Sequence, residues 1–309
     1  MQLDIVVGFF LLGALAQLVR SDLRLPTGLY QSCVIFLLLA IGLKGGAALS
    51  TYSAATLVPQ SLAVLAFGAL LPLLAFPVLH WIGKWSRLDA AATAAHYGSV
   101  SVATYAVAVA LLNSHGIEYE AYFPLFVALL EVPAIVVGIL LARQSAKDAG
   151  TGKLFHELTC NQGVLLLLGG IVIGAWAGER TASVMPFFGQ LFHGVLALFL
   201  LEMGRVAAAR LRDVKGQGAF LLSFGIFMPL MGGVAGGVLG SLLGLSAGGV
   251  FLLAVLGSSA SYIAVPAAMA VALPQANASV SITLSLAITF PFNVLVAIPV
   301  YLAFIQHWS

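Results

Sequence analysis

Charged side chains are scarce in this sequence: Asp, Glu, Lys and Arg make up only 8% of its 309 residues, against roughly 25% in an average soluble domain. Apolar residues make up 61%, and the mean hydropathy is +1.08. So few polar side chains cannot cover a water-facing surface, and lipid must be the main solvent of the folded chain. This composition excludes a soluble globular protein, a disordered chain and a coiled coil.

Cysteine and basic clusters are also lacking. Cys33 and Cys160 lie in or beside different apolar segments, without a CxxC pair or the His spacing of a zinc site. Neither a structural disulfide nor bound zinc is therefore expected. The 13 Lys and Arg residues form no basic stripe of the kind that a phosphate backbone needs. No nucleic-acid partner is expected, and the predicted surrounding of the chain is a lipid bilayer.

Long apolar runs, by contrast, fill most of the chain. Runs of about 17 to 25 residues between charged or Pro/Gly-rich breaks predict transmembrane helices. Ten are predicted, over residues 3–19, 27–43, 54–82, 90–113, 120–142, 162–178, 187–209, 217–244, 247–272 and 279–306. The first four residues lack the basic region of a cleaved signal peptide, so the first run is expected to be a retained span. The fold class is therefore an all-α polytopic membrane protein with short loops.

Lys and Arg divide unevenly between the two sets of loops. Eleven of the 13 lie in alternate loops, namely those with Arg20 and Arg24, with Lys84 and Arg87, with Arg143, Lys147 and Lys153, and with Arg205, Arg210, Arg212 and Lys215. Only Lys44 and Arg180 lie on the other side. Because cytoplasmic loops carry the excess of Lys and Arg, the pattern predicts both termini outside, which requires an even number of spans.

Two similar motifs indicate an internal repeat. His96-Tyr97-Gly98-Ser99-Val100-Ser101 lies in the fourth predicted helix and Leu256-Gly257-Ser258-Ser259-Ala260-Ser261 in the ninth, with an offset of 159 residues. Glu131-Val132-Pro133 in the fifth has a counterpart in Phe290-Pro291 of the tenth. Two five-helix halves, 1–150 and 151–309, are predicted, and because five is odd the repeat is inverted. The alternative is chance similarity between helices rich in small residues.

Gly and Ser interrupt the fourth and ninth helices near the middle of the bilayer. Interruptions at matching positions of two halves predict discontinuous helices around a polar midplane site. The amino ends of two half-helices together supply about one unit of positive charge, which favours a monovalent anion. The predicted substrate-binding residues are Gly98, Ser99, Ser101, Thr104, Gly257, Ser258, Ser259 and Ser261. The alternative is that these small residues only allow the helices to pack closely.

Hydroxyls and unwound carbonyls also suit a hard cation, so a sodium ion is predicted nearby. Its candidate ligands are Ser101, Glu131 and Asn293. A carboxylate at the depth of Glu131 marks an ion site or a proton relay, although a hydrogen-bonded spectator is the alternative. His96 is expected to be a hydrogen-bonded packing residue. Lys44, His193 and Glu202 are expected near span ends, with their polar tips at the interface.

Several stretches in register resemble the sodium-dependent bicarbonate transporter family known from cyanobacteria. They are Ile41-Gly42-Leu43-Lys44-Gly45-Gly46, the run from Gly98-Ser99-Val100-Ser101 through Ile117-Glu118-Tyr119-Glu120-Ala121 to Glu131-Val132-Pro133-Ala134, and the run from Ser258-Ser259-Ala260-Ser261 through Pro266 to Leu273-Pro274-Gln275-Ala276-Asn277. The resemblance covers nearly the whole chain. It implies a ten-helix, five-plus-five transporter, a homotrimer in the bacterial plasma membrane, that imports bicarbonate with sodium and uses no other cofactor.

The resemblance also implies a mobile core of helices 3–5 and 8–10 that carries substrate against a scaffold of helices 1, 2, 6 and 7. By analogy, the family's binding region falls on Gly98, Ser101 and Thr104, and on Ser259 and Ser261. This is the region that the interrupted helices indicate on their own.

This chain departs from the family pattern at the site. Tyr262 stands where the cyanobacterial members have an Asp, Ala264-Val265-Pro266 replaces their Ser-Gly-Pro, and Val102-Ala103 replaces a Gly-Ser pair. A different small organic anion is therefore an open alternative to bicarbonate. Some family members bind a soluble PII-like regulator. Because the loop from Arg143 to Asn161 is much shorter here, that partner is not carried over.

The leading hypothesis is a secondary active transporter, not an enzyme, that moves bicarbonate or a similar small anion with sodium by alternating access. The nearest alternative is a cation/proton antiporter with Glu131 as the proton carrier, because such proteins share broken, crossed helices. An intramembrane hydrolase would need Ser258 within hydrogen-bonding reach of His96 or His193. A channel would need a ring of charges or a filter-like segment, and the sequence has neither.

Overall fold

The computed structural model describes residues 5–49, 52–142, 162–214 and 218–308, and every regular element in these ranges is helical. The first half contains α1 (Ile5–Leu18), α2 (Thr27–Leu49), α3 (Ala54–Pro77), η1 (Val78–Ile82), α4 (Arg87–Gly98), α5 (Val102–Ser114) and α6 (Phe123–Ala142). The second contains α8 (Gln162–Ala177), η2 (Gly178–Ser183), α9 (Met185–Phe188), α10 (Phe192–Val214), α11 (Gly218–Leu242), α12 (Ala247–Ser258), α13 (Ala264–Ala272), α14 (Ala278–Thr283), η3 (Leu284–Thr289), α15 (Phe290–Phe292), η4 (Asn293–Ala297) and α16 (Ile298–Trp308).

Eight helical segments among the described residues are long and apolar enough to cross a membrane, and two shorter apolar helices are Ile5–Leu18 and Ala247–Ser258. An all-helical, multi-pass membrane protein is therefore confirmed. Two predicted helices have wrong boundaries: the second extends to Leu49 rather than residue 43, and the seventh spans Phe192–Val214 rather than 187–209. The short helix α9 ends at Phe188 and α10 begins only at Phe192, with Gly189 between them.

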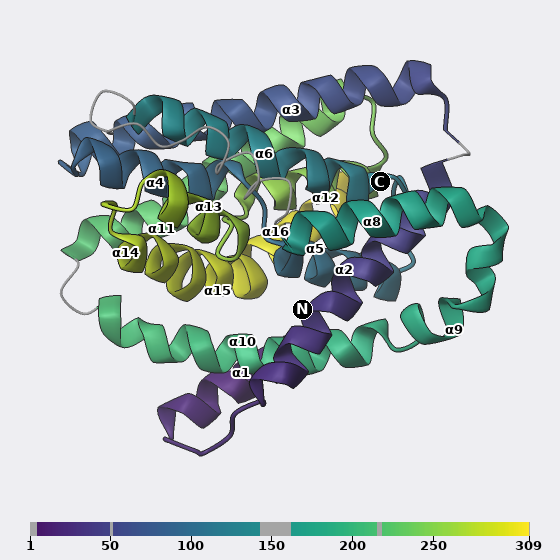
Figure 1. Ribbon diagram of the computed structural model, residues 1–309, viewed down its shortest axis with the longest axis horizontal. Coiled ribbons are helices and arrows are strands. Elements are labelled where there is room, and N and C mark those ends of the chain that lie inside the picture. Colours follow the sequence, from purple (N-terminus) through teal and green to yellow (C-terminus); the bar gives the residue numbers. More distant parts are fainter. Residues whose placement is uncertain (1–4, 50–51, 143–161, 215–217, 309) are drawn as a thin grey trace.

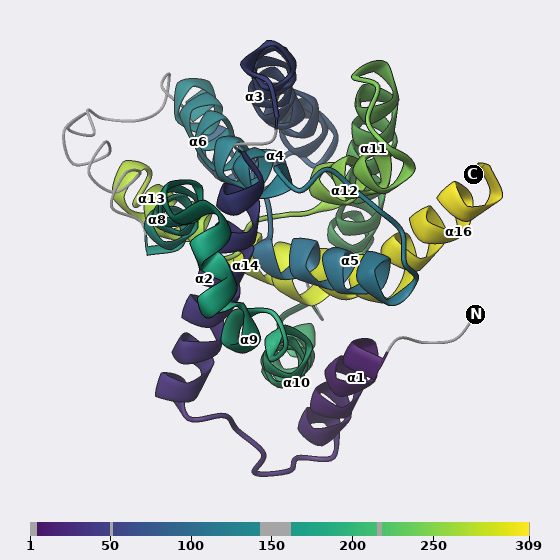
Figure 2. The same cartoon turned by 90° about the vertical axis from the view of Figure 1, so that its right-hand side faces the viewer.

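Long helices such as α3, α6, α8 and α10 run roughly along the long axis of the molecule, whereas α5 runs across it (Figures 1 and 2). Seen end-on, α1, α2, α8 and α10 form one group, and α3, α4, α6, α11, α12 and α16 form another, with α5 near the centre (Figure 2). Within the first group, α1 packs against α10 and α2 packs against α8. Within the second, α11 packs against α12, and α3, α4 and α6 pack against one another.

Glycines allow the close contacts within the first group. A Cβ at Gly13 would overlap the backbone carbonyl of Leu201 on α10, and a Cβ at Gly204 would overlap that of Phe10 on α1. Between α2 and α8, a Cβ at Gly46 would overlap the carbonyl of Ile171 in the same way. In a lipid solvent such small residues let helix backbones approach and gain dispersion contacts, since no hydrophobic effect drives the helices together.

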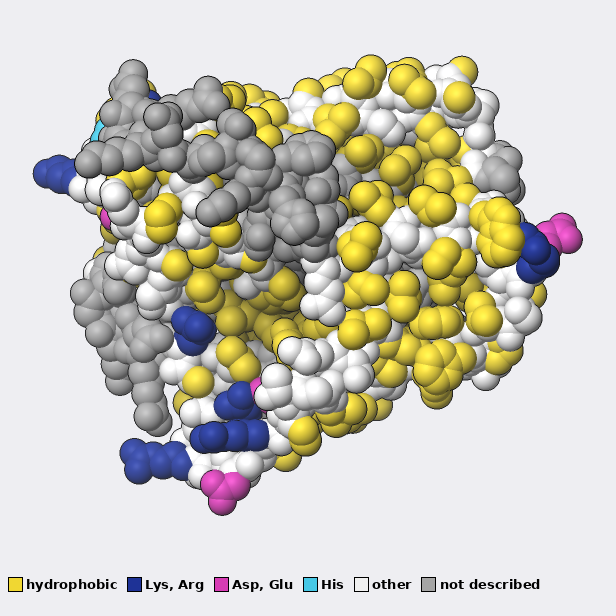
Figure 3. Space-filling view, in the orientation of Figure 1, with side chains coloured by type: hydrophobic (Ala, Val, Ile, Leu, Met, Phe, Trp, Pro, Cys, Tyr) yellow, Lys and Arg dark blue, Asp and Glu magenta, His cyan; other side chains and the backbone are white. Residues whose placement is uncertain are grey.

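The molecular surface has a wide apolar region, and Lys and Arg side chains gather mainly toward one end (Figure 3). Large exposed hydrophobic residues such as Leu62, Val172 and Val234 belong to this apolar surface. We call the end that carries the α1–α2, η1–α4 and α10–α11 connections the basic end (Figure 1). An apolar surface of this kind is stable in contact with lipid rather than water.

Candidate functional site

Both expected helix interruptions are present. Residues 99–101 separate α4 from α5, and residues 259–263 separate α12 from α13. Each break opens with an extended serine: Ser99 has φ −97° and ψ 168°, and Ser259 has φ −81° and ψ 163°. Counted between these two serines the breaks are 160 residues apart, one more than the 159 between Gly98 and Gly257.

After each break, a serine hydroxyl accepts a hydrogen bond from the first turn of the next helix. The Ser101 hydroxyl accepts a hydrogen bond from the backbone N–H of Thr104 at 3.2 Å and so caps α5. The Ser261 hydroxyl accepts one from the backbone N–H of Val265 at 3.4 Å, in the first turn of α13. Capping by serine satisfies a backbone donor that a helix start leaves free, which explains why the chain breaks at these residues.

The two breaks are hydrogen-bonded to each other. The backbone N–H of Ser101 donates to the hydroxyl of Ser259 at 3.2 Å, and the backbone N–H of Ser261 donates to the carbonyl of His96 at 2.8 Å. The buried His96 ring closes the arrangement through Nδ1, which lies 2.6 Å from the carbonyl of Ser261. Because a carbonyl only accepts, Nδ1 carries the proton. The expectation of a hydrogen-bonded His96 is confirmed, and its partner is the opposite break.

The two deep polar side chains attach to different breaks. The Ser99 hydroxyl donates to Glu131 Oε2 at 2.9 Å, and the Asn293 amide donates to the carbonyl of Ser258 at 2.7 Å. Glu131 is buried, with 6% of its surface exposed, and forms no ion pair with any described residue. A buried carboxylate held by a single neutral donor is costly unless a proton or cation joins it.

A cavity of about 290 Å³ adjoins the breaks and reaches toward Gln162 at the start of α8. The breaks, α5, α6 and α13 contribute one part of its wall: Val100, Ser101, Val102, Ala103, Glu131, Ser261, Tyr262, Ile263, Ala264 and Ala267. The first helix group contributes Val34, Leu37, Leu38, Gln162, Gly163 and Phe199. The cavity therefore lies between the first helix group and the interrupted helices. The first turns of α5 and α13 border it, and in a helix those first backbone N–H groups lack an intrahelical acceptor.

Three of the predicted site residues line this cavity: Ser101, Ser261 and Glu131. Ser99 is next to it through its bond to Glu131. Ser258 and Ser259 turn their hydroxyls back to carbonyls of their own helix, those of Val255 at 3.0 Å and Leu256 at 2.8 Å.

Gly98 and Gly257 face the neighbouring helices instead. A Cβ on Gly98 would overlap the ring of Pro72 on α3, and one on Gly257 would overlap the carbonyl of Gly232 on α11. The alternative that small residues only allow close helix packing therefore describes these two glycines. Only their backbone atoms could contact a substrate.

Tyr262 is the lining residue that the sequence singled out without giving it a role. It lies directly after Ser261, is 9% exposed, and meets the ring of Phe290 edge-on with centroids 5.4 Å apart. Its buried hydroxyl has no hydrogen-bond partner. The sequence drew attention to it only as a departure from the pattern that the family resemblance implies. Nothing in the sequence indicated that α2 and α10 form the apolar wall of the cavity, because Leu38 and Phe199 resemble any other residues of a transmembrane helix.

Several buried polar atoms around the breaks lack hydrogen-bond partners. They include Thr104 Oγ1 at the start of α5, Asn293 Oδ1 in η4, and the hydroxyls of Tyr262 and Tyr301. Burying an unpaired polar atom costs about 1–3 kcal/mol, so such atoms in a native protein call for a ligand, an ion or water. Oxygen donors of this kind suit a hard cation such as sodium.

The hydrolase arrangement is not formed. Ser258 donates to Val255 O, His96 Nδ1 bonds Ser261 O, and neither His96 nor His193 accepts a hydrogen bond from Ser258. Without a base in reach, the Ser258 hydroxyl is not activated as a nucleophile.

Comparison with known proteins gives one family. The model of the Na⁺-dependent bicarbonate transporter superfamily matches residues 5–306, essentially the whole chain. No curated protein matches the chain significantly.

Proposed function

The chain belongs to the Na⁺-dependent bicarbonate transporter superfamily, and we propose that it imports bicarbonate, or a similar small anion, together with sodium by alternating access. Family membership supports a membrane transporter rather than an enzyme. The crossing of two interrupted helices beside the 290 Å³ cavity is the observation that supports an anion site there. Their amino ends supply positive potential without a buried Lys or Arg.

In this proposal the anion lies against the first turns of α5 and α13, with Ser101, Ser261 and the Tyr262 hydroxyl as donors. Ser99, Ser258 and Ser259 hold the shape of the breaks through their own hydrogen bonds. Tyr262 takes the place of the family's Asp at the cavity wall and offers a neutral hydroxyl donor. A neutral donor suits an anion better than a second carboxylate would.

The unpartnered oxygens Thr104 Oγ1 and Asn293 Oδ1 support a sodium site behind the breaks. Asn293 does not line the cavity, whereas Ser101 and Glu131 do. The cavity wall therefore brings together only two of the three predicted ligands Ser101, Glu131 and Asn293, and Asn293 contacts the end of α12 instead. Sodium bound there would offset the charge of the anion, so each ligand would raise the affinity for the other.

The packing of the first helix group supports an inverted repeat of residues 1–150 and 151–309. In a five-plus-five repeat α1 corresponds to α8, and α2 corresponds to α10. The pair of α1 with α10 then maps onto the pair of α8 with α2, and both pairs are observed. The scaffold would be this first group and the mobile core the second, with the cavity between them.

The proposed topology places the basic end in the cytoplasm and both termini outside, in a bacterial plasma membrane. The cavity reaches toward Gln162, which follows a basic loop, so the described conformation would face inward. The homotrimer stays a prediction. The loop from Arg143 to Asn161, whose short length argued against a PII-like regulator, lies outside the described residues.

Uptake of radiolabelled bicarbonate into proteoliposomes, with and without an inward sodium gradient, tests the function. We expect uptake that depends on sodium and is competed by unlabelled bicarbonate. Uptake that is equal in sodium and potassium would reject sodium coupling. Absence of uptake by correctly folded protein would direct the search to other small anions.

Glu131 separates this proposal from a cation/proton antiporter. In the proposed symporter, Glu131→Gln keeps the contact with Ser99 but removes a charge that attracts sodium, so the apparent sodium affinity should fall about tenfold or more. Glu179→Gln, at an exposed carboxylate in η2, is the matched control and should leave sodium affinity unchanged. A sodium-induced pH change in substrate-free proteoliposomes that Glu131→Gln abolishes would favour the antiporter instead.

A further inference from the structure

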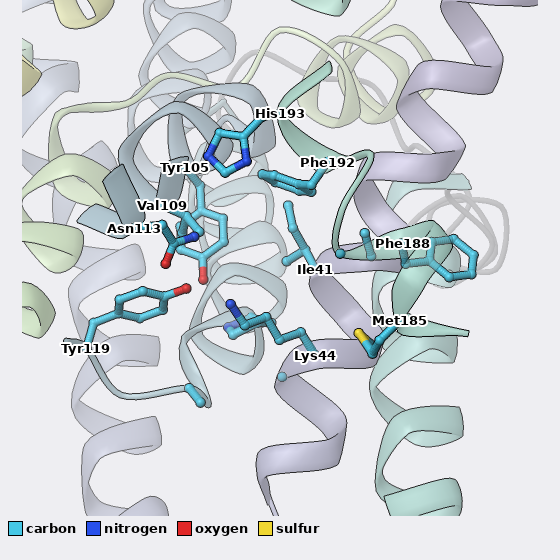
Figure 4. A pocket seen from close by; sticks show the side chains of 15 residues that line it. Ile41, Lys44, Tyr105, Val109, Asn113, Tyr119, Met185, Phe188, Phe192 and His193 are labelled. Carbon is cyan, nitrogen blue, oxygen red and sulfur yellow. The ribbon is translucent and has the colours of Figure 1, made fainter. Parts of the chain in front are cut away.

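A second cavity, of about 80 Å³, lies near the end of the molecule opposite the basic end. Its wall comes from α2, α5, the α5–α6 connection, α9 and the start of α10 (Figure 4). Lys44, Asn113 and His193 line it and are exposed, so the cavity is open to the outside of the described chain. Neither the proposed transport site nor the helix breaks include any of these three residues.

This cavity lies in line with the 290 Å³ cavity, because the same helices border both. On α2, Leu38 lines the first cavity and Ile41 and Lys44 line the second. On α10, Phe199 lines the first and Phe192 the second.

The α5 residues share one helix face. Ser101 lines the first cavity, and Tyr105, Val109 and Asn113 follow at intervals of four residues and line the second. Ile41 and Tyr105 are buried and line the second cavity, and each lies about one helical turn beyond a residue that lines the first, Leu38 on α2 and Ser101 on α5. A rearrangement of these two side chains would bring the cavities closer to one path.

Hydrogen-bond donors converge in the second cavity. The Lys44 ammonium lies 6.0 Å from the centre of the Tyr119 ring, and the Asn113 side chain lies close enough to the Tyr119 hydroxyl to act on its pKa. Figure 4 shows Lys44, Tyr105, Tyr119 and Asn113 pointing into the same space. Burial raises the pKa of Tyr119, so its hydroxyl stays protonated at neutral pH and remains a possible donor.

The charge of Lys44 is not neutralised by a described carboxylate. The one ion pair among the described residues joins Arg205 to Glu202. Glu120, which lies next to the cavity-lining Ala121, instead accepts hydrogen bonds from the backbone and hydroxyl of Ser246. A lysine that has no carboxylate partner and lies in a concave site lined by neutral hydrogen-bond donors attracts anions.

We infer that this second cavity is an entry site, where Lys44, Asn113 and Tyr119 bind a small monovalent oxyanion before it passes to the helix breaks. The inference rests on the proposed function, which places this end of the molecule outside. A volume of about 80 Å³ is several times the roughly 10–15 Å³ that one water molecule needs on the same measure. The cavity therefore has room for an anion of about four heavy atoms.

Kinetics of the Lys44→Gln variant test the entry site. We expect the KM for bicarbonate to rise about five- to tenfold, while the maximal rate stays within about twofold, because the charge acts on capture rather than on the conformational step. The difference from the wild type should shrink at high ionic strength. An unchanged KM would overturn the inference and leave the proposed function intact.

Arg180→Gln is the matched control, because it removes a positive charge from the same end but outside this cavity. Arg180 stacks on Trp176, with its guanidinium carbon 4.4 Å from the ring centre, and bonds the Trp176 carbonyl. We expect its KM to match the wild type. An equal rise in KM for Arg180→Gln and Lys44→Gln would reject a specific site in favour of general surface charge.

Thiol labelling tests the same site without transport. The variant Ala121→Cys places a thiol at a half-buried position of the cavity wall, where a maleimide can label it. Labelling of the unsubstituted protein measures the background from Cys33 and Cys160. At equal ionic strength, sodium bicarbonate should slow labelling about threefold relative to sodium gluconate, when bicarbonate is near twice its Kd.

The protection should disappear in the double variant Ala121→Cys/Lys44→Gln. Protection that survives in the double variant, or no protection in Ala121→Cys, overturns the entry site. If the wild type does not take up bicarbonate at all, the proposed function fails, and this labelling still decides whether the cavity binds the anion.

Discussion

Ser101→Leu should reduce bicarbonate uptake about 10- to 100-fold while the protein still folds. The Ser101 hydroxyl caps α5 and its side chain lines the cavity, and its backbone N–H bonds Ser259 across the two breaks. Leucine removes the cap, which costs about 1 kcal/mol of stability, and fills the space where the anion would lie. Loss of a buried hydrogen bond to a charged ligand is worth about 1.5–3 kcal/mol, which corresponds to this range of affinity.

Two further variants separate a site defect from a folding defect. Ser101→Thr keeps a hydroxyl and a capping side chain, so it should retain most of the uptake. Ser114→Leu removes a hydroxyl at the far end of the same helix, where it donates to the Leu111 carbonyl at 2.9 Å, and should leave uptake unchanged. Uptake by Ser101→Leu within twofold of the wild type would contradict the placement of the anion at the breaks.

The helices and their breaks follow from local sequence. The run 54–82 is mostly apolar and is helical over the same residues, with a short π-helix at its end. The Ser101 hydroxyl lies directly before α5 and caps it, and the Ser261 hydroxyl bonds the backbone N–H of Val265 in the first turn of α13; both are short-range interactions. Hydropathy and capping act over a few residues, so both are readable without knowledge of the tertiary structure.

Contacts between distant segments decide the rest, and local sequence does not encode them. His96 and Ser261 are 165 positions apart, and only the crossing of α4 with the α12–α13 break brings them together. For the same reason the sequence could not tell that the Ser259 hydroxyl points back to Leu256 while Ser261 borders the cavity. The sequence could predict which types of residue form the site, but the direction in which each side chain points depends on tertiary packing.

The second large effect concerns Gly232, which the sequence did not single out. A Cβ at Gly232 would overlap the carbonyl of Gly257, and a Cβ at Gly257 would overlap the carbonyl of Gly232. Gly232→Ala must therefore push α11 away from the end of α12, the helix that leads into Ser259. We expect a loss of about 1–3 kcal/mol of stability, seen as a lower melting temperature, together with loss of uptake.

Gly237→Ala on the same helix provides the matched control, because it should act in the opposite direction. A Cβ at Gly237 would have the Ala254 Cβ as its neighbour, at 3.8 Å, which is an ordinary contact. Alanine favours a helix over glycine by up to about 1 kcal/mol, so Gly237→Ala should leave the melting temperature unchanged or raise it. If both variants lowered the melting temperature equally, glycine at 232 would matter for helix flexibility. Opposite shifts would show that close approach of α11 holds the α12 break, and with it the anion site, in position.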